Sequence, residues 1–168
     1  MKIISIDWAF HKTGIAIYDS SSKTLYSSLW VIADKYKIKL LDKDFYKWYV
    51  SIFEKNTIKV DKNDIVLVEV GYQRIDTMTR FYDTFIHLWM LKYQNLKFLN
   101  SRTWIQHTLK NTVLSKLKKG QDKQLLADLF YDRFGERFDI TQDEIDAIMM
   151  LLDAYPNIEI KKICSLKK

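Results

Sequence analysis

The 168-residue chain is poor in the residues that interrupt regular structure, with one proline and four glycines. This composition argues against disorder, long linkers and a succession of tight hairpins. Cys164 is the only cysteine, which excludes an intrachain disulfide and a thiolate zinc cluster. No apolar stretch approaches the roughly 20 residues that cross a bilayer, and no signal peptide opens the chain. We therefore expect a single cytoplasmic domain, residues 1–168, with no membrane contact.

Basic and aromatic residues are abundant instead. The chain is 14% aromatic and carries a formal charge of +6. Residues 92–133 contain nine basic and three acidic side chains, which equals the whole net excess. A basic region suits a polyanionic partner, because Lys and Arg replace the counterions on phosphates. The alternative is an ordinary solvated face of a Lys-rich protein.

The apolar patterns predict an α/β protein with a five-stranded mixed sheet and helices on both faces. Strands are expected at residues 2–7, 14–19, 24–33, 64–70 and 96–100, the first two joined by a turn over 8–13. Helices are expected at residues 44–54, 76–94, 101–111, 121–134 and 141–154. Residues 64–70 are almost continuously apolar, as in a central strand that is covered on both faces.

Four carboxylates stand out by position: Asp7 and Glu69 end apolar runs, and Asp143 and Asp146 begin the last expected helix. A charge beside buried strands is costly unless something compensates it. Asp143 and Asp146 are three residues apart and share a helix face, whereas Glu144 is expected to close a capping box with the residue before the helix. Converging oxygen ligands are what Mg²⁺ requires, so the pattern indicates a metal-dependent nuclease. Singly, each acid is also explained as a structural strand-end residue or a helix-start residue favoured by the helix dipole.

Three segments carry a family resemblance: IISIDWAFHKTGIAIYD, IVLVEVGYQR and QDEIDAIMML. Together they resemble the RuvC-type Holliday-junction resolvases of the RNase H-like superfamily, over roughly residues 2–154. That family places an Asp on the first strand, a Glu on the fourth and a D-x-x-D-A pair on the last helix. Asp7, Glu69, Asp143 and Asp146 match these positions in order, and Gly14 matches a glycine that opens the second strand. The small size and Lys-rich composition resemble phage or small-genome members, which implies the cytoplasm of a bacterial host.

The resemblance implies an RNase H-like fold and Mg²⁺-dependent hydrolysis of DNA at four-way junctions, in recombination or repair. Two Mg²⁺ ions per site, replaceable by Mn²⁺, would activate the attacking water and stabilise the leaving oxygen. Asp7 would contact both ions, with Glu69 on one side and the Asp143/Asp146 pair on the other. Lys123 resembles a family lysine that supports the scissile phosphate; the alternative is a solvated lysine at a helix start.

The same resemblance implies DNA contacts and a homodimer that nicks both strands of a symmetric junction. Tyr72 occupies the place of an aromatic that stacks on junction bases, although it is equally explained as a core residue. Arg74 and Arg80 would hold phosphates, and the polar loop 115–123 would add Lys116, Lys118, Lys119 and Lys123. The expected helix at 77–93 is the candidate dimer face.

Three other functions remain open from the sequence. A broader branched-DNA endonuclease that cuts forks, flaps or three-way junctions would have the same acids and the same basic loop. A ribonuclease H shares the carboxylates, but the D-x-x-D pair on a terminal helix favours the resolvase pattern. A catalytically silent junction-binding module is the alternative outside enzymes, and it has no need for all four acids.

Overall fold

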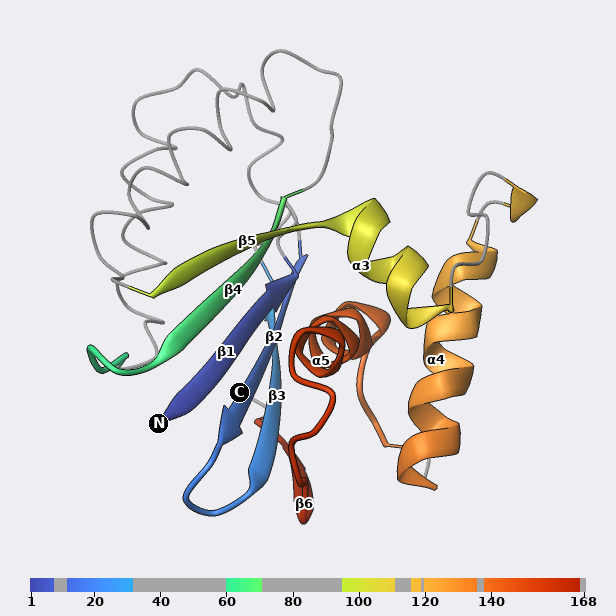
Figure 1. Cartoon of the computed structure of the whole chain (residues 1–168). Helices are drawn as coiled ribbons and strands as arrows, with labels where there is room; N and C mark the ends of the chain where they lie inside the picture. The colour runs from blue at the N-terminus through green and yellow to red at the C-terminus, as the bar shows by residue number, and fades with distance from the viewer. Residues whose placement is uncertain are drawn as a thin grey trace.

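The computed structural model describes residues 1–7, 12–31, 60–70, 95–110, 116–118, 120–135 and 138–166. Figure 1 shows a twisted sheet with helices packed against one side. The strands are β1 (Lys2–Asp7), β2 (Lys12–Asp19), β3 (Thr24–Val31), β4 (Ile65–Val70), β5 (Leu96–Asn100) and β6 (Lys162–Ser165). The helices in these ranges are α3 (Ser101–Thr108), α4 (Gln121–Phe134) and α5 (Gln142–Ala154). None of these helices has the length and apolar character needed to cross a membrane.

The sheet is mixed, as expected, with strand order β5-β4-β1-β2-β3-β6. β1, β2 and β3 form an antiparallel unit, while β4 pairs parallel with β1, β5 with β4, and β6 with β3. The expectation of five strands was wrong, because the C-terminal segment adds β6 at the edge beside β3. This strand has only four residues, with two half-buried side chains between exposed ones, so it carries too little alternation to be detected in the sequence.

Two element boundaries also differ from the expectation. β2 begins at Lys12 and not at Gly14, so the last two residues of the expected turn belong to the strand, where Thr13 is buried and pairs with Trp30. α3 ends at Thr108, and Lys110 has a φ of 52°, which an α-helix does not accommodate. The helices expected at 44–54 and 76–94 lie outside the described residues.

The centre of the sheet is covered on both faces. Residues 3–6 of β1 and 66–68 of β4 are buried without interruption. Since neighbouring side chains on a strand point to opposite faces, both faces must be shielded from solvent. This confirms the prediction of a central strand at 64–70. On one face α5 lies across β1, β2 and β3, and α3 and α4 pack against α5 (Figure 1).

The start of α5 is fixed by two local features. The first is the predicted capping box: the backbone N–H of Glu144 donates to Thr141 Oγ1 at 3.3 Å, and Glu144 Oε2 accepts from the backbone N–H of Thr141 at 2.9 Å. The second is a close approach at Gly14, where a Cβ atom would lie 1.8 Å from the carbonyl oxygen of Asp143. Because Gly14 pairs with Asp7 in the β1–β2 ladder, this approach brings the first turn of α5 to the end of β1.

Candidate active site

Two of the four predicted acids lie at the same edge of the sheet. Asp7 is the last residue of β1, and Glu69 is the penultimate residue of β4. β1 and β4 are parallel, and Ile6 pairs with Val68. Asp7 and Glu69 are therefore the next residues on adjacent strands, and the sheet alone places their side chains at one end.

The other two acids come from the first turns of α5. Asp146 is only 6% exposed, and Asp143 is partly buried. Burial is the largest cause, and together with the charges of Glu69, Asp146 and Asp143 it raises the pKa of Asp7 to about 8, against the opposing charge of Lys123. The β1–β4 register, the approach of Gly14 to the backbone of Asp143 and these charge interactions together place the four predicted carboxylates near the end of β1.

Glu69 has a specific protein partner. Trp104 donates its indole N–H to Glu69 Oε2 at 2.8 Å. Burial first, and then the charge of Asp146, raise the pKa of Glu69 to about 7, against the opposing effects of the Trp104 hydrogen bond and the Lys123 charge. Glu69 is therefore an oriented carboxylate in a site that disfavours its charge.

Asp146 is held by two groups from opposite sides of its carboxylate. Gln142 Nε2 donates to Asp146 Oδ1 at 2.7 Å, and Lys123 Nζ lies 3.4 Å from Asp146 Oδ2. Burial raises the pKa of Asp146, while these two partners lower it. Burial by itself lowers the pKa of Lys123, but Asp146, Asp7 and Asp143 together raise it above its usual value. Lys123, which was predicted at the site, is thus a positively charged side chain next to the acids. This side chain remains 54% exposed.

Trp104 and Gln142 were not predicted as site residues. Gln142 was detectable, because a Gln four residues before an Asp on a helix forms a known side-chain hydrogen bond. Gln142 Nε2 also lies 3.3 Å from the carbonyl oxygen of Lys123, which ties the start of α4 to α5. Trp104 has no comparable local signal, since its partner is 35 residues away in the chain.

The donor chemistry of the site fits a hard divalent cation. All four acids offer carboxylate oxygens, which Mg²⁺ and Mn²⁺ prefer. A bound cation would also relieve the repulsion that raises the pKa of Asp7. Across the described residues, no three acidic, histidine or cysteine side chains already surround a common point as metal ligands do. Asp7, Glu69, Asp143 and Asp146 are the residues that would hold such a cation, at the end of β1 and β4 and the start of α5.

The structure describes three of the seven residues that were predicted to contact DNA. Lys116 and Lys118 are exposed in the segment before α4, and Lys123 opens that helix toward the acids. Tyr72, Arg74, Arg80 and Lys119 lie outside the described residues, as does the candidate dimer helix at 77–93. The DNA-contacting roles of all seven predicted residues stay predictions.

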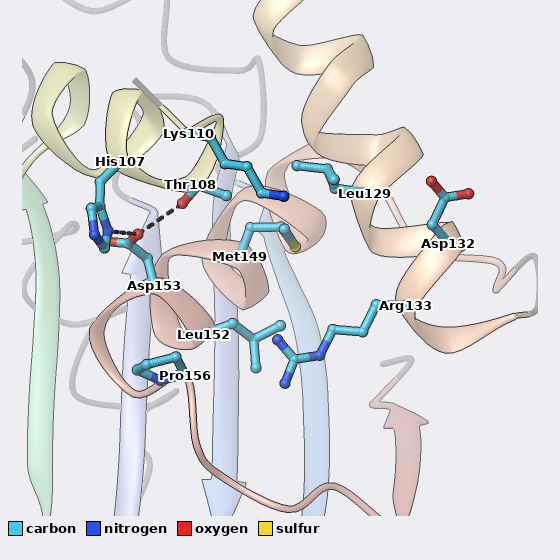
Figure 2. Close-up of a pocket in the computed structure, with 10 residues that line it drawn as sticks. All are labelled: His107, Thr108, Lys110, Leu129, Asp132, Arg133, Met149, Leu152, Asp153 and Pro156. Atoms are coloured by element: carbon cyan, nitrogen blue, oxygen red, sulfur yellow. Dashed lines mark hydrogen bonds and ion pairs between the residues drawn. The ribbon is translucent and has the colours of Figure 1, made fainter. Parts of the chain in front are cut away.

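A separate hollow lies between α3, α4 and α5, away from the acids. Figure 2 shows its lining, which includes His107, Lys110 and Arg133 around an apolar floor of Met149 and Leu152. His107 Nδ1 lies 2.5 Å from Asp153 Oδ1, which ties the end of α3 to the end of α5. The residues that line this hollow include none of the four predicted acids.

Comparison with known proteins supports the fold alone. No family model matches the chain, and no curated protein does. Among solved structures, Thermus thermophilus RuvC in complex with a Holliday-junction substrate is 10% identical, with a TM-score of 0.50 over 91% of this chain and 92% of that chain. RuvC from the same organism, in a second structure, gives a TM-score of 0.49 at 10% identity over the same shares. The fowlpox virus resolvase, in complex with Holliday-junction DNA, gives 0.39 at 18% identity over 95% of this chain and 89% of that chain. The expected α/β architecture is confirmed: this chain has the fold of RuvC.

Proposed function

We propose that the chain is a RuvC-type, divalent-metal-dependent endonuclease that resolves four-way DNA junctions. The observation that carries this proposal is the meeting of four carboxylates from β1, β4 and α5, where burial and mutual repulsion raise the pKa of Asp7 to about 8. A structural role for these acids leaves that repulsion unexplained, whereas a cation site requires it. The RuvC fold and its likeness to a structure with a Holliday-junction substrate support the choice of DNA.

Each acid has a distinct place in the proposed site. The charges of the other three acids all act on Asp7, so Asp7 would be the ligand shared by both ions, with Glu69 binding one side and Asp143 and Asp146 the other. When bound, two Mg²⁺ ions would polarise the attacking water and stabilise the leaving 3′-oxygen. Rigid strands and the first turns of a buried helix hold these ligands, which favours precise placement.

The cationic side chains next to the acids suit a phosphate backbone. Lys123 is half-exposed beside Asp146, and Lys116 and Lys118 are exposed a few residues earlier in the chain. Lysines at such positions neutralise phosphates and fix the backbone without reading sequence. A four-way junction presents two equivalent strands, so we further propose that a homodimer supplies one site for each strand.

Nicking of a labelled synthetic four-way junction tests the proposal, beside matched duplex and fork substrates, with Mg²⁺ or with EDTA. Wild type is compared with Asp146→Asn, which keeps the shape of the buried side chain but removes its charge, and with Asp132→Asn, which changes an exposed aspartate on α4. Paired symmetric cuts in the junction alone, lost in EDTA and in Asp146→Asn but kept in Asp132→Asn, support a resolvase.

Other results point elsewhere. Equal cutting of the fork would indicate a general branched-DNA endonuclease. Tight junction binding without cutting in Mg²⁺ or Mn²⁺ would overturn the enzyme assignment and leave a junction-binding module.

A further inference from the structure

Trp104 lies between the candidate active site and the core. Its side chain is 2% exposed and belongs to the main hydrophobic cluster, together with residues of α4 and α5. Its indole N–H nevertheless points out of that cluster to Glu69 Oε2, at 2.8 Å. A buried indole N–H needs an acceptor, and here the acceptor is a carboxylate of the proposed metal site.

The β4–β5 register produces this contact. Glu69 pairs with Leu99, and Val70 pairs with Asn100, the last residue of β5. Asn100 is also the N-cap of α3, and its side chain accepts from the backbone N–H of Thr103 at 3.2 Å. Because α3 starts level with the end of β4, a residue in its first turns is directed back toward Glu69, and Trp104 is that residue.

An indole is a suitable donor for a carboxylate that must remain available to a cation. It carries no charge, so it orients Glu69 without neutralising it, in contrast to the Lys123 contact on Asp146. It also occupies Oε2 and leaves the second oxygen, Oε1, outside this hydrogen bond. Hydrogen bonds of this kind to metal ligands commonly control both the orientation and the affinity of the ligand.

We propose that Trp104 is a positioning residue that holds Glu69 in the orientation for divalent-metal binding. This inference rests on the proposed function and adds to it a residue that does not itself touch metal or DNA. The alternative is that Trp104 contributes only packing, with its N–H satisfied by the nearest acceptor.

The first test compares Trp104→Phe with a packing control. Phenylalanine keeps an aromatic ring in the core but has no N–H, while Phe130→Leu removes comparable volume from the same cluster without touching Glu69. Binding of Mn²⁺ is measured by the electron paramagnetic resonance signal of the free ion, and the Mg²⁺ concentration for half-maximal junction cleavage is measured in parallel. We expect Trp104→Phe to raise both values by about tenfold or more, and Phe130→Leu to lower the melting temperature while leaving both unchanged. Equal values for Trp104→Phe and wild type, or equal shifts in the two variants, would overturn the inference.

A second test uses the wild-type protein and does not depend on the folding of Trp104→Phe. Tryptophan labelled with ¹⁵N gives one indole N–H resonance for each of the five tryptophans. One resonance is expected to move on addition of Mg²⁺ and to lose that response in Glu69→Gln. If no indole resonance depends on both Mg²⁺ and Glu69 in a protein that cuts junctions, Trp104 has no positioning role. If wild type neither binds Mn²⁺ nor cuts any branched DNA, the proposed function itself fails.

Discussion

Replacement of Asp7 by asparagine is expected to stabilise the protein in the absence of divalent metal while it abolishes cleavage. In the folded chain Asp7 has a pKa of about 8, against 3.8 in its ordinary state. At pH 7 the folded protein must therefore either take up a proton or hold an unfavourable charge. One pKa unit corresponds to about 1.4 kcal/mol. Between the ordinary pKa of Asp7 and pH 7 there are about three units, so Asp7 can destabilise the folded protein by at most about 4 kcal/mol at this pH.

Asparagine removes this penalty and nearly preserves the shape of the side chain. In the wild-type protein, side-chain rotation and water reduce part of this electrostatic penalty. We therefore expect the free energy of unfolding of Asp7→Asn to exceed that of wild type by about 1–3 kcal/mol. For a domain of this size that is a rise of roughly 2–12 °C in melting temperature. A substitution at a catalytic carboxylate that stabilises the fold is the signature of a site selected for function and not for stability.

The dependence on pH gives the sign of the effect. An acid whose folded pKa is raised has its full stability below its unfolded value and loses it as pH rises through the folded value. The wild-type protein in EDTA should therefore lose stability between about pH 4 and pH 8 relative to Asp7→Asn, so that the difference widens from pH 5 to pH 8. Millimolar Mg²⁺ should raise the wild-type melting temperature at pH 8 and leave the variant nearly unchanged.

Differential scanning fluorimetry across this pH range measures the effect, with Asp132→Asn as the control for loss of an exposed carboxylate. The control should stay within about 0.5 kcal/mol of wild type at every pH. An Asp7→Asn protein that melts below wild type in EDTA at pH 7.5 would refute the reasoning. So would a difference that stays constant from pH 5 to pH 8, because repulsion among ionised acids must grow with pH.

Two further substitutions test the geometry of the site. Gly14→Ala places a methyl group 1.8 Å from the carbonyl oxygen of Asp143, so α5 must move away from β2. We expect the free energy of unfolding to fall by about 3 kcal/mol or more, measured as a lower urea midpoint. The control Gly120→Ala meets open space but has a φ of 80°, and it should cost about 1 kcal/mol. A Gly14→Ala protein as stable as Gly120→Ala would contradict the close approach. Lys123→Gln removes a cation that lowers the pKa of Asp7 and Asp146, so its melting temperature in EDTA at pH 8 should fall below that of wild type, and Mg²⁺ should narrow the gap. Identical melting curves in EDTA would show that Lys123 does not compensate the acids.

The sequence was informative where a feature is local. The capping box needs only residues 141–144, and the structure confirms both of its hydrogen bonds. The central strands were recognisable because a strand that is buried on both faces has no polar positions. Once both strand ends were placed, the acids at Asp7 and Glu69 had to share an edge of the sheet, since parallel strands end on the same side.

The sequence was uninformative where a contact depends on register. Trp104 reaches Glu69 only because β5 pairs with β4 so that α3 starts level with the end of β4, and no pattern within either segment contains that offset. The edge strand β6 was missed for a related reason. Its four residues are ordered by pairing with β3, from Thr24↔Lys162 to Ser27↔Ser165, and their own alternation is too short to indicate a strand.

Charges at the ends of buried strands must be compensated, and the described residues compensate the four acids only in part. Among the described residues, the contacts that compensate the acids are one indole N–H, which donates to Glu69, and one amide and one lysine, which contact Asp146. That set leaves the pKa of Asp7 at about 8 and that of Glu69 at about 7. A protein under selection for stability alone would replace Glu69 by glutamine, because the amide oxygen can still accept from Trp104 while the charge repulsion is removed. A divalent cation, as proposed above, would supply the positive charge that the described residues do not provide.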